Sequence, residues 1–346
     1  MKGYEGVMNI VFTIIIAIAV FMLIILIHEF GHFVVAKSSG VLVHEFSIGF
    51  GPKLLKWKKG ETEYSLRIFP VGGFVRLEGE DEDSKDPRAL NNKPVGKRLA
   101  VMAAGAGFNV ITGFLAMTIF FAMQPQYTTL EIGKVLDIPG SQAAQYLEVG
   151  DKIVSLDGKK VWNFNDFSFI MSNADVKNPV EVGIKRGGEK LVVEVQPVEY
   201  EGRYLLGIEM MRENMNLKNA IICGFNETFY MVRLVVYSLM MLVTGKVPVS
   251  AMSGPVGTTV LIGQAARQGL DWLIYMFALL SVNIGIFNVI PFPALDGGRI
   301  FFLLIEMIRR KPIPPEKEGM IHFVGLVILM LFMIFVTSSD IFKLFA

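Results

Sequence analysis

The stretch His28-Glu29-Phe30-Gly31-His32 directly follows an uncharged run from Val7 to Ile27. A helix needs about 20 apolar residues to cross the hydrocarbon core of a bilayer, so this run is long enough to span it. The run is long for the apolar region of a signal peptide and lacks a convincing A-x-A cleavage site. We therefore interpret it as a retained membrane helix that ends in three ionisable residues. Such residues are costly in a membrane and need a reason.

The apolar residues of the whole chain are gathered into runs of similar length. Hydrophobic residues make up 52% of the 346 residues, and the mean hydropathy is +0.49. Three further uncharged runs are Leu99–Met123, Trp272–Leu295 and Phe323–Ser339. The pattern predicts a polytopic α-helical membrane protein with about four transmembrane helices. The net charge of +1 and the lack of a basic stripe argue against a nucleic-acid partner. The single cysteine, Cys223, rules out an internal disulfide framework.

The motif H-E-x-x-H has a chemical reading on a helix. Residues four apart lie on the same helical face, so the imidazoles of His28 and His32 can bind one Zn²⁺. Glu29 then addresses the bound water as the catalytic base. The alternative is a polar cluster where the helix leaves the membrane.

A catalytic zinc site usually has three protein ligands and one open position. Asp296 is the best candidate for the third ligand because it ends an apolar run and precedes Gly297-Gly298. His44 and His322 are poorer candidates, since each is isolated in a polar or interfacial stretch where we expect it to be solvated. Without the H-E-x-x-H motif, Asp296 would be read as a helix cap.

Two stretches between the spans have the pattern of β-structure. Residues 43–76 alternate polar and apolar residues between glycines, which predicts a β-hairpin, and the acidic run Glu78–Asp83 beyond it is expected to be a solvated turn. Residues 128–211 form the only segment long enough for a water-soluble domain. Within it we expect a helix over Phe164–Ser172 and strands over Glu131–Val135, Lys152–Leu156, Val180–Lys185 and Leu191–Gln196.

The segment 217–244 is apolar but carries Asn226, Glu227 and Arg233, which are costly at bilayer depth. We expect it to lie on the outer membrane surface, as part of an amphipathic segment 217–270. The alternative is a fifth crossing.

Positive charge favours the four-span version. With the N-terminus outside, the first span delivers the basic stretch 37–98 to the cytoplasm, as the positive-inside tendency prefers. The second span puts residues 128–211 outside, and the third leads inward, so that Arg309-Arg310-Lys311 lies inside. His28, His32 and Asp296 then lie at similar depth, towards the cytoplasm. A full crossing by 217–244 would separate them.

Taken together, these motifs resemble the site-2 protease family of intramembrane zinc metalloproteases, in particular its bacterial RseP/RasP-type regulators of sigma factors. The resemblance rests on HEFGH, on FPVGGFVRLEGE at 69–80 and on SVNIGIFNVIPFPALDGGR at 281–299. It implies that Asp296 is the third zinc ligand and that Asn288, Pro291 and Pro293 shape the substrate site. It also implies a re-entrant β-loop at 43–76, for which an ordinary cytoplasmic hairpin is the alternative. Residues 147–158 resemble PDZ domains of bacterial proteases, but there is room for one such module rather than two.

The implied fold is two transmembrane helices and the hairpin in 1–123, one extracytoplasmic PDZ-like α+β domain at 128–211, the surface segment, and two last transmembrane helices in 271–346. The implied function is zinc-dependent endoproteolysis of the transmembrane segments of single-pass proteins, such as a trimmed anti-sigma factor or a remnant signal peptide. The implied location is a bacterial plasma membrane, with the active site towards the cytoplasm. The alternatives are a metal transporter and a PDZ-containing membrane scaffold without catalysis. A transporter would be expected to show inverted repeats, and a scaffold needs none of the four motif residues.

Overall fold

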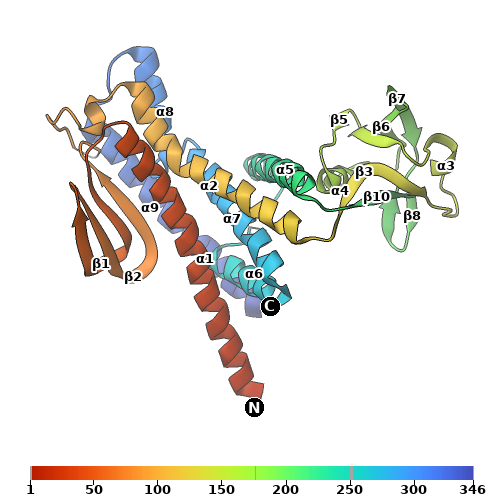
Figure 1. Cartoon of the computed structure of the whole chain (residues 1–346), viewed down its shortest axis with the longest axis horizontal. Coiled ribbons are helices and arrows are strands. Elements are labelled where there is room, and N and C mark those ends of the chain that lie inside the picture. The colour runs from red at the N-terminus through yellow and green to blue at the C-terminus, as the bar shows by residue number, and fades with distance from the viewer. Residues whose placement is uncertain (1, 81, 176, 250–251, 346) are drawn as a thin grey trace. The chain divides into compact units, whose positions relative to one another are not determined.

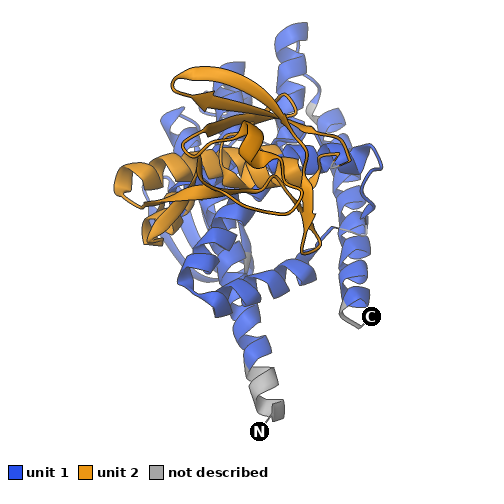
Figure 2. Ribbon diagram, turned by 90° about the vertical axis from the view of Figure 1, so that its right-hand side faces the viewer, with its two compact units in different colours: residues 1–116, 234–346 blue, residues 117–233 orange. Residues whose placement is uncertain are grey.

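The computed structural model describes residues 2–80, 82–175, 177–249 and 252–345 (Figure 1). The chain forms two compact units, residues 1–116 with 234–346 and residues 117–233 (Figure 2). It passes between them within two helices, α2 (Val95–Met123) and α5 (Leu217–Val243). Each unit has its own cluster of buried apolar side chains.

The first unit is built on long apolar helices, α1 (Lys2–Ser38), α2, α7 (Leu270–Val289) and α9 (Pro315–Phe345). Within the described residues, five helices are long and apolar enough to cross a membrane: the four predicted ones and α5. Their outer surfaces expose large apolar side chains, such as Ile15 at 60% and Leu331 at 62%. Lipid rather than water suits such surfaces, and the chain is accordingly a membrane protein with several apolar helices.

The third apolar run is divided where the sequence analysis expected one continuous span to Leu295. Helix α7 ends at Val289, and a new helix, α8 (Asp296–Arg309), begins after six residues outside any helix. Pro291 and Pro293 lie in this connection and cannot donate the hydrogen bonds that would continue α7. The uncharged run therefore extends six residues beyond the end of α7, and Asp296 is the first residue of α8.

A second short helix, α6 (Pro255–Gln268), packs against α1 and α7. Asp340 of α9 is 3% exposed and accepts a hydrogen bond of 2.8 Å from the Gly257 amide in the first turn of α6. This bond satisfies one of the free amide groups that every helix start presents.

The predicted hairpin is present as β1 (Val43–Lys59) and β2 (Thr62–Leu77), followed by a short 3₁₀ helix η1 (Leu90–Asn92). Both strands bend, so residues 43–48 pair with residues 73–77 on one side, and residues 45–48 also pair with residues 63–66 on the other. Residues 73–77 consequently form an edge of this sheet. Among the described residues, no further strand pairs with that edge.

The hairpin buries a polar cluster beside apolar Val43, Phe46 and Leu77, and its exposed surface mixes large apolar side chains with Lys56, Lys58 and Lys59. Buried Glu45 accepts hydrogen bonds from Ser65 and Arg67, each at 2.7 Å, and Arg67 also donates to Ser47 at 2.9 Å. Burial alone would raise the pKa of Glu45, but these bonds outweigh it and lower that pKa below its ordinary value. The exposed side chains include Phe50, Leu54, Leu55, Trp57, Ile68 and Phe69.

The second unit contains a sheet of order β10-β3-β4-β6-β7, with β5 pairing on β4 and a separate hairpin β8-β9. The four predicted strands are confirmed, and so is the predicted helix α4 (Phe164–Ser172). The strands are β3 (Gln126–Val135), β4 (Lys152–Leu156), β5 (Lys159–Lys160), β6 (Val180–Arg186), β7 (Glu189–Val195), β8 (Val198–Tyr200), β9 (Arg203–Leu205) and β10 (Ile208–Asn214), and a further helix is α3 (Ala143–Tyr146). Buried aliphatic side chains such as Ile132, Ile153 and Ile184 form its core.

Two of the three polar residues that made α5 ambiguous, Glu227 and Arg233, are paired with α4 and the residue before it, inside the second unit. Glu227 is 2% exposed and accepts hydrogen bonds from Asn163 at 2.8 Å and Asn165 at 2.7 Å. Arg233 donates to both oxygens of the buried Asp166, at 2.9 and 3.0 Å. These hydrogen bonds offset the free-energy cost of removing the polar groups of Glu227 and Arg233 from water.

Candidate metal centre

Three side chains that sequence analysis selected meet in the first unit. His28 and His32 come from α1, and Asp296 comes from the start of α8. The Asp296 Oδ2 atom lies 2.9 Å from His28 Nε2 and 3.2 Å from His32 Nε2, and the two Nε2 atoms are 3.2 Å apart. Both histidines are 8% exposed. Two imidazole nitrogens and one carboxylate oxygen are a donor set that zinc accepts in catalytic sites, so the residues fit this metal.

The outer nitrogens of both imidazoles are held by α2. His32 Nδ1 donates to the Val101 carbonyl at 2.8 Å, which leaves its Nε2 lone pair free for a metal. The Asn109 side-chain amide lies 3.3 Å from His28 Nδ1. Among the described residues Asn109 Oδ1 has no hydrogen-bond partner. The amide orientation that turns Oδ1 towards His28 Nδ1–H satisfies both groups and frees His28 Nε2 as well.

Glycine residues allow helix α2 to approach the two histidines closely. A β-carbon built on Gly105 would lie 2.6 Å from His28 Nε2 and closer still to His32 Nε2. Gly31 lies about one turn of α1 from His28. A β-carbon on Gly31 would lie 2.6 Å from the Ala104 carbonyl oxygen of α2. Sequence analysis missed Gly105 and Asn109. The small-residue run at 103–107 was the available signal, because small residues let helix backbones approach closely.

Glu29 lies beside this group and lines a cavity of about 200 Å³ together with His32, Asp296 and Glu80. Residues Phe74, Val75 and Leu77 of the β2 edge line the same cavity. The edge strand thus passes the three ligand candidates and Glu29. A carboxylate in this position can take a proton from a water held at the metal position.

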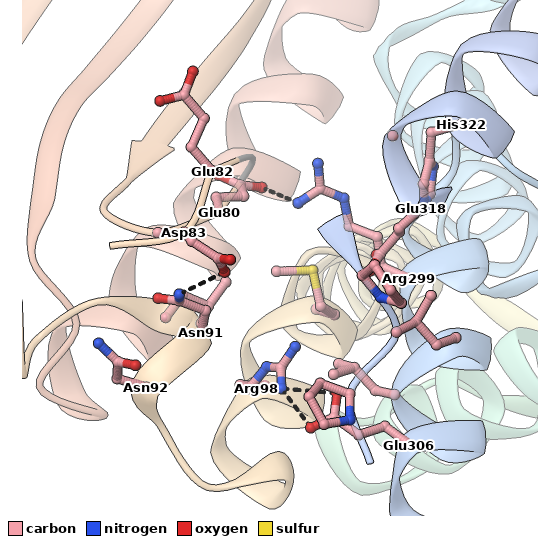
Figure 3. A pocket seen from close by; sticks show the side chains of 18 residues that line it. Glu80, Glu82, Asp83, Asn91, Asn92, Arg98, Arg299, Glu306, Glu318 and His322 are labelled. Atoms are coloured by element: carbon pink, nitrogen blue, oxygen red, sulfur yellow. Dashed lines mark hydrogen bonds and ion pairs between the residues drawn. The ribbon is translucent and has the colours of Figure 1, made fainter. Parts of the chain in front are cut away.

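The acidic turn is not simply solvated, contrary to expectation. Glu80 lines the Glu29 cavity and accepts a hydrogen bond of 2.9 Å from Arg299 of α8 (Figure 3). On the same side, Arg98 of α2 forms a paired hydrogen bond with Glu306 of α8, at 2.9 Å to each oxygen. Two ion pairs therefore hold α8, which begins at Asp296, to neighbouring segments.

The predicted substrate residues lie on the connection that leads to Asp296. Asn288 donates to the Ile284 carbonyl of its own helix at 2.9 Å, and Pro291 is exposed. Pro293 packs against α9 at Gly325, where a β-carbon would lie 2.5 Å from the Pro293 carbonyl oxygen. The role of Asn288, Pro291 and Pro293 in substrate binding stays a prediction.

The remaining two histidines differ in surroundings. His44 is partly exposed and paired with Glu78. The His322 side chain is only 17% exposed, and its Nδ1 accepts a hydrogen bond of 3.0 Å from the Ala294 amide. The expectation that His322 is solvated is wrong.

The second unit carries a groove of about 870 Å³. One wall is formed by Phe164, Phe167 and Met171 of α4, and the other by Ile208 and Met210 of β10. Because β10 ends the strand order, its outer edge has no strand partner among the described residues.

Two histidines and an aspartate around one point, with a glutamate beside them, define a metalloprotease-type site. The chain belongs to peptidase family M50, the site-2 protease family, whose model matches residues 16–332. It is 43% identical to CPE1693 of Clostridium perfringens, whose name describes a zinc metalloprotease, over 95% of this chain and 98% of the relative. It is 31% identical to the regulator of sigma-W protease RasP of Bacillus subtilis, over 96% and 99%. The zinc metalloprotease RasP of Geobacillus kaustophilus is also 31% identical, over 96% and 98%. The protein is thus a site-2-type zinc metalloprotease.

Proposed function

We propose that this metalloprotease cleaves peptide bonds within the transmembrane segments of membrane-anchored proteins. The observation that carries the proposal is the meeting of His28 and His32, within an apolar helix, with the sequence-distant Asp296 beside Glu29. Solvent-exposed substrates do not require such a site to be built on membrane helices. A transmembrane substrate does.

In this mechanism His28, His32 and Asp296 hold the metal. When bound, zinc supplies a water whose pKa is lowered towards about 7 and a Lewis acid for the peptide carbonyl. The Glu29 carboxylate accepts a proton from the attacking water and returns it to the leaving nitrogen. Val101 and Asn109 keep the imidazoles oriented throughout.

A peptide bond within an intact helix is shielded, so the substrate must be locally unwound. Unwound backbone groups in a bilayer cost several kcal/mol each unless they are hydrogen-bonded again. The free edge of β2 at residues 73–77 offers such bonds beside Glu29, as an added strand would use them. We infer that substrate is presented to the site as an extra strand on this edge.

The large apolar side chains that the hairpin exposes support its immersion in the membrane surface, where the exposed Lys56, Lys58 and Lys59 would reach the headgroups. The exposed Leu54, Leu55 and Trp57 would face lipid, while Glu45, Ser65 and Arg67 satisfy one another inside.

The pairing of α5 supports the four-span topology. Glu227 and Arg233 are bound to the residues of the second unit that precede and form α4, so this part of α5 stays with that unit rather than crossing alone. We therefore place the PDZ-like unit outside the cell and the metal centre towards the cytoplasm, in a bacterial plasma membrane.

The test of catalysis is Glu29→Gln in the purified full-length protein. The variant keeps the metal ligands but loses the base, so we expect zinc to remain bound and cleavage of a model transmembrane substrate to fall by about 10²–10⁴-fold. The matched control is Glu82→Gln on the exposed acidic turn, which should cleave like the wild type. Undiminished cleavage by zinc-loaded Glu29→Gln would refute the mechanism.

The PDZ-like unit has two modes of action to distinguish. Its groove beside the β10 edge supports binding of a peptide terminus by strand addition, whereas its bulk alone would exclude substrates with large outer domains. Ser168→Trp fills the groove without removing the unit, and Lys190→Trp is the control on an exposed strand. A binder predicts that only Ser168→Trp loses cleavage of trimmed substrate. A filter predicts that both variants still cleave trimmed substrate and reject untrimmed substrate.

A further inference from the structure

The connection between α7 and α8 has a conformation that its own residues do not favour. Ala294 has φ +81°, in the left-handed region that residues with a β-carbon rarely adopt. Two residues later, Asp296 presents Oδ2 to both histidines. Pro291 and Pro293 in the same connection lack amide hydrogens and cannot anchor it by donating hydrogen bonds. Phe292 and Leu295 donate backbone hydrogen bonds within the connection, at 2.6 and 3.1 Å, whereas the Ala294 amide takes its partner from outside it.

Helix α9 holds the connection through two residues three positions apart on one face. His322 Nδ1 accepts the Ala294 N–H at 3.0 Å, and Gly325 lets the Pro293 backbone lie directly against the helix. Phe302 of α8 meets the His322 ring edge-on, with ring centroids 5.6 Å apart. The strained residue is thus held by a hydrogen bond and its neighbour by close packing.

The hydrogen bond fixes the chemical form of His322. Since Nδ1 accepts from an amide, the neutral ring carries its hydrogen on Nε2. That atom is buried, 3.7 Å from Glu318 Oε1, and both residues are among those that line the pocket of about 600 Å³ in Figure 3. Among the described residues His322 Nε2 has no hydrogen-bond partner. The single acceptor nitrogen of the neutral imidazole, Nδ1, is therefore occupied by the Ala294 amide.

We propose that His322 is a positioning residue that holds Asp296 in place for zinc through its Nδ1 bond to the Ala294 amide. This inference rests on the proposed function, in which Asp296 is a zinc ligand. Without the His322 Nδ1 acceptor, Ala294 can leave its left-handed conformation. The Asp296 carboxylate is then no longer held in position beside the two histidines.

The test compares two substitutions in the full-length protein. His322→Leu removes the acceptor at similar size, whereas Asn in His322→Asn can place its Oδ1 near the position of Nδ1 and accept the same bond. His44→Leu is the matched control, because His44 pairs with Glu78 in the hairpin region rather than with this connection. Zinc affinity is measured by competition with a chelator, and amide exchange of residues 290–296 is measured in the metal-free protein.

We expect His322→Leu to bind zinc about 10–100-fold more weakly, as lost outer partners of metal ligands do, and to exchange the Ala294 amide faster. His322→Asn should restore most of both properties, and His44→Leu should change neither. Wild-type values in His322→Leu would overturn the proposal. Equal losses in both His322 variants would also overturn it, because they would show that ring packing rather than the acceptor matters.

Asp296→Ala separates this inference from the proposed function. If Asp296→Ala loses zinc while His322→Leu keeps it, only the positioning role fails. If Asp296→Ala binds zinc like the wild type, Asp296 is not a ligand, and the zinc site and the positioning role fail together.

Discussion

Gly105 of α2 faces His32 of α1 so closely that a β-carbon on Gly105 would fall inside van der Waals distance of His32 Nε2. The same β-carbon would lie 2.6 Å from His28 Nε2. The space between the two imidazoles therefore exists only because position 105 has no side chain.

Gly105→Ala should push the imidazoles apart and lower zinc affinity by about tenfold or more, since ligand geometry tolerates little displacement. Chelator competition on the purified protein measures this. Gly107→Ala is the matched control, because a β-carbon there meets nothing within 4 Å. Zinc binding by Gly105→Ala at the wild-type level would show that the helices adjust around the new methyl group.

Local chemistry explains what the sequence predicted at this site. His28, Glu29 and His32 form a contiguous motif, and the glycines and prolines around Asp296 mark the end of an apolar run. The hairpin and the strands of the second unit follow from alternation and turn residues, which report local geometry. Each of these signals lies within a short window of sequence.

The residues that sequence analysis missed depend on rotation and packing of whole helices. The small-residue run at 103–107 marks where another helix can approach α2 closely, but it does not show that the approaching residues are the two histidines of α1. His322 was expected to be solvated because no local pattern shows that α9 contacts Ala294, twenty-eight residues earlier in the chain. The partners of Glu227 and Arg233 are likewise sixty or more residues away.

Asp151 predicts a pH dependence of the second unit. Its carboxylate is 1% exposed and accepts two hydrogen bonds of 2.7 Å from Arg186. The Arg186 bonds lower the pKa of Asp151 below its ordinary value, burial opposes this, and the Glu148 amide adds to the lowering. The folded state thus holds its proton less tightly than the unfolded state, whose aspartates titrate near about 3.9. The stabilisation is full above that pH and is lost as the pH falls through the folded-state pKa.

Asp151→Asn should therefore lower the free energy of unfolding of this unit by about 1–3 kcal/mol at pH 7. Between pH 5 and 3, the free energy of unfolding should fall less in the variant than in the wild type. Urea unfolding in detergent, followed through Trp162 in a protein without Trp57 and Trp272, measures this. Asp137→Asn on the exposed surface should leave the curve unchanged. If the free energy of unfolding depends on pH in the same way for Asp151→Asn and the wild type, the Asp151–Arg186 ion pair is not the cause of that dependence.

Trp57 reports whether the hairpin enters the membrane. Its side chain is 55% exposed and stacks on Tyr64 with ring centroids 5.7 Å apart, on the same hairpin that exposes Leu54 and Leu55. Each Å² of apolar surface moved from water to lipid gains about 25 cal/mol, so this face favours the bilayer. In a protein retaining only Trp57, we expect lipids brominated on their acyl chains to quench its fluorescence in vesicles. A protein retaining only Trp272, within the α7 span, is the positive control. If Trp272 is quenched but Trp57 responds only to an aqueous quencher, the hairpin lies in the cytoplasm, and strand addition would have to capture substrate after it leaves the membrane.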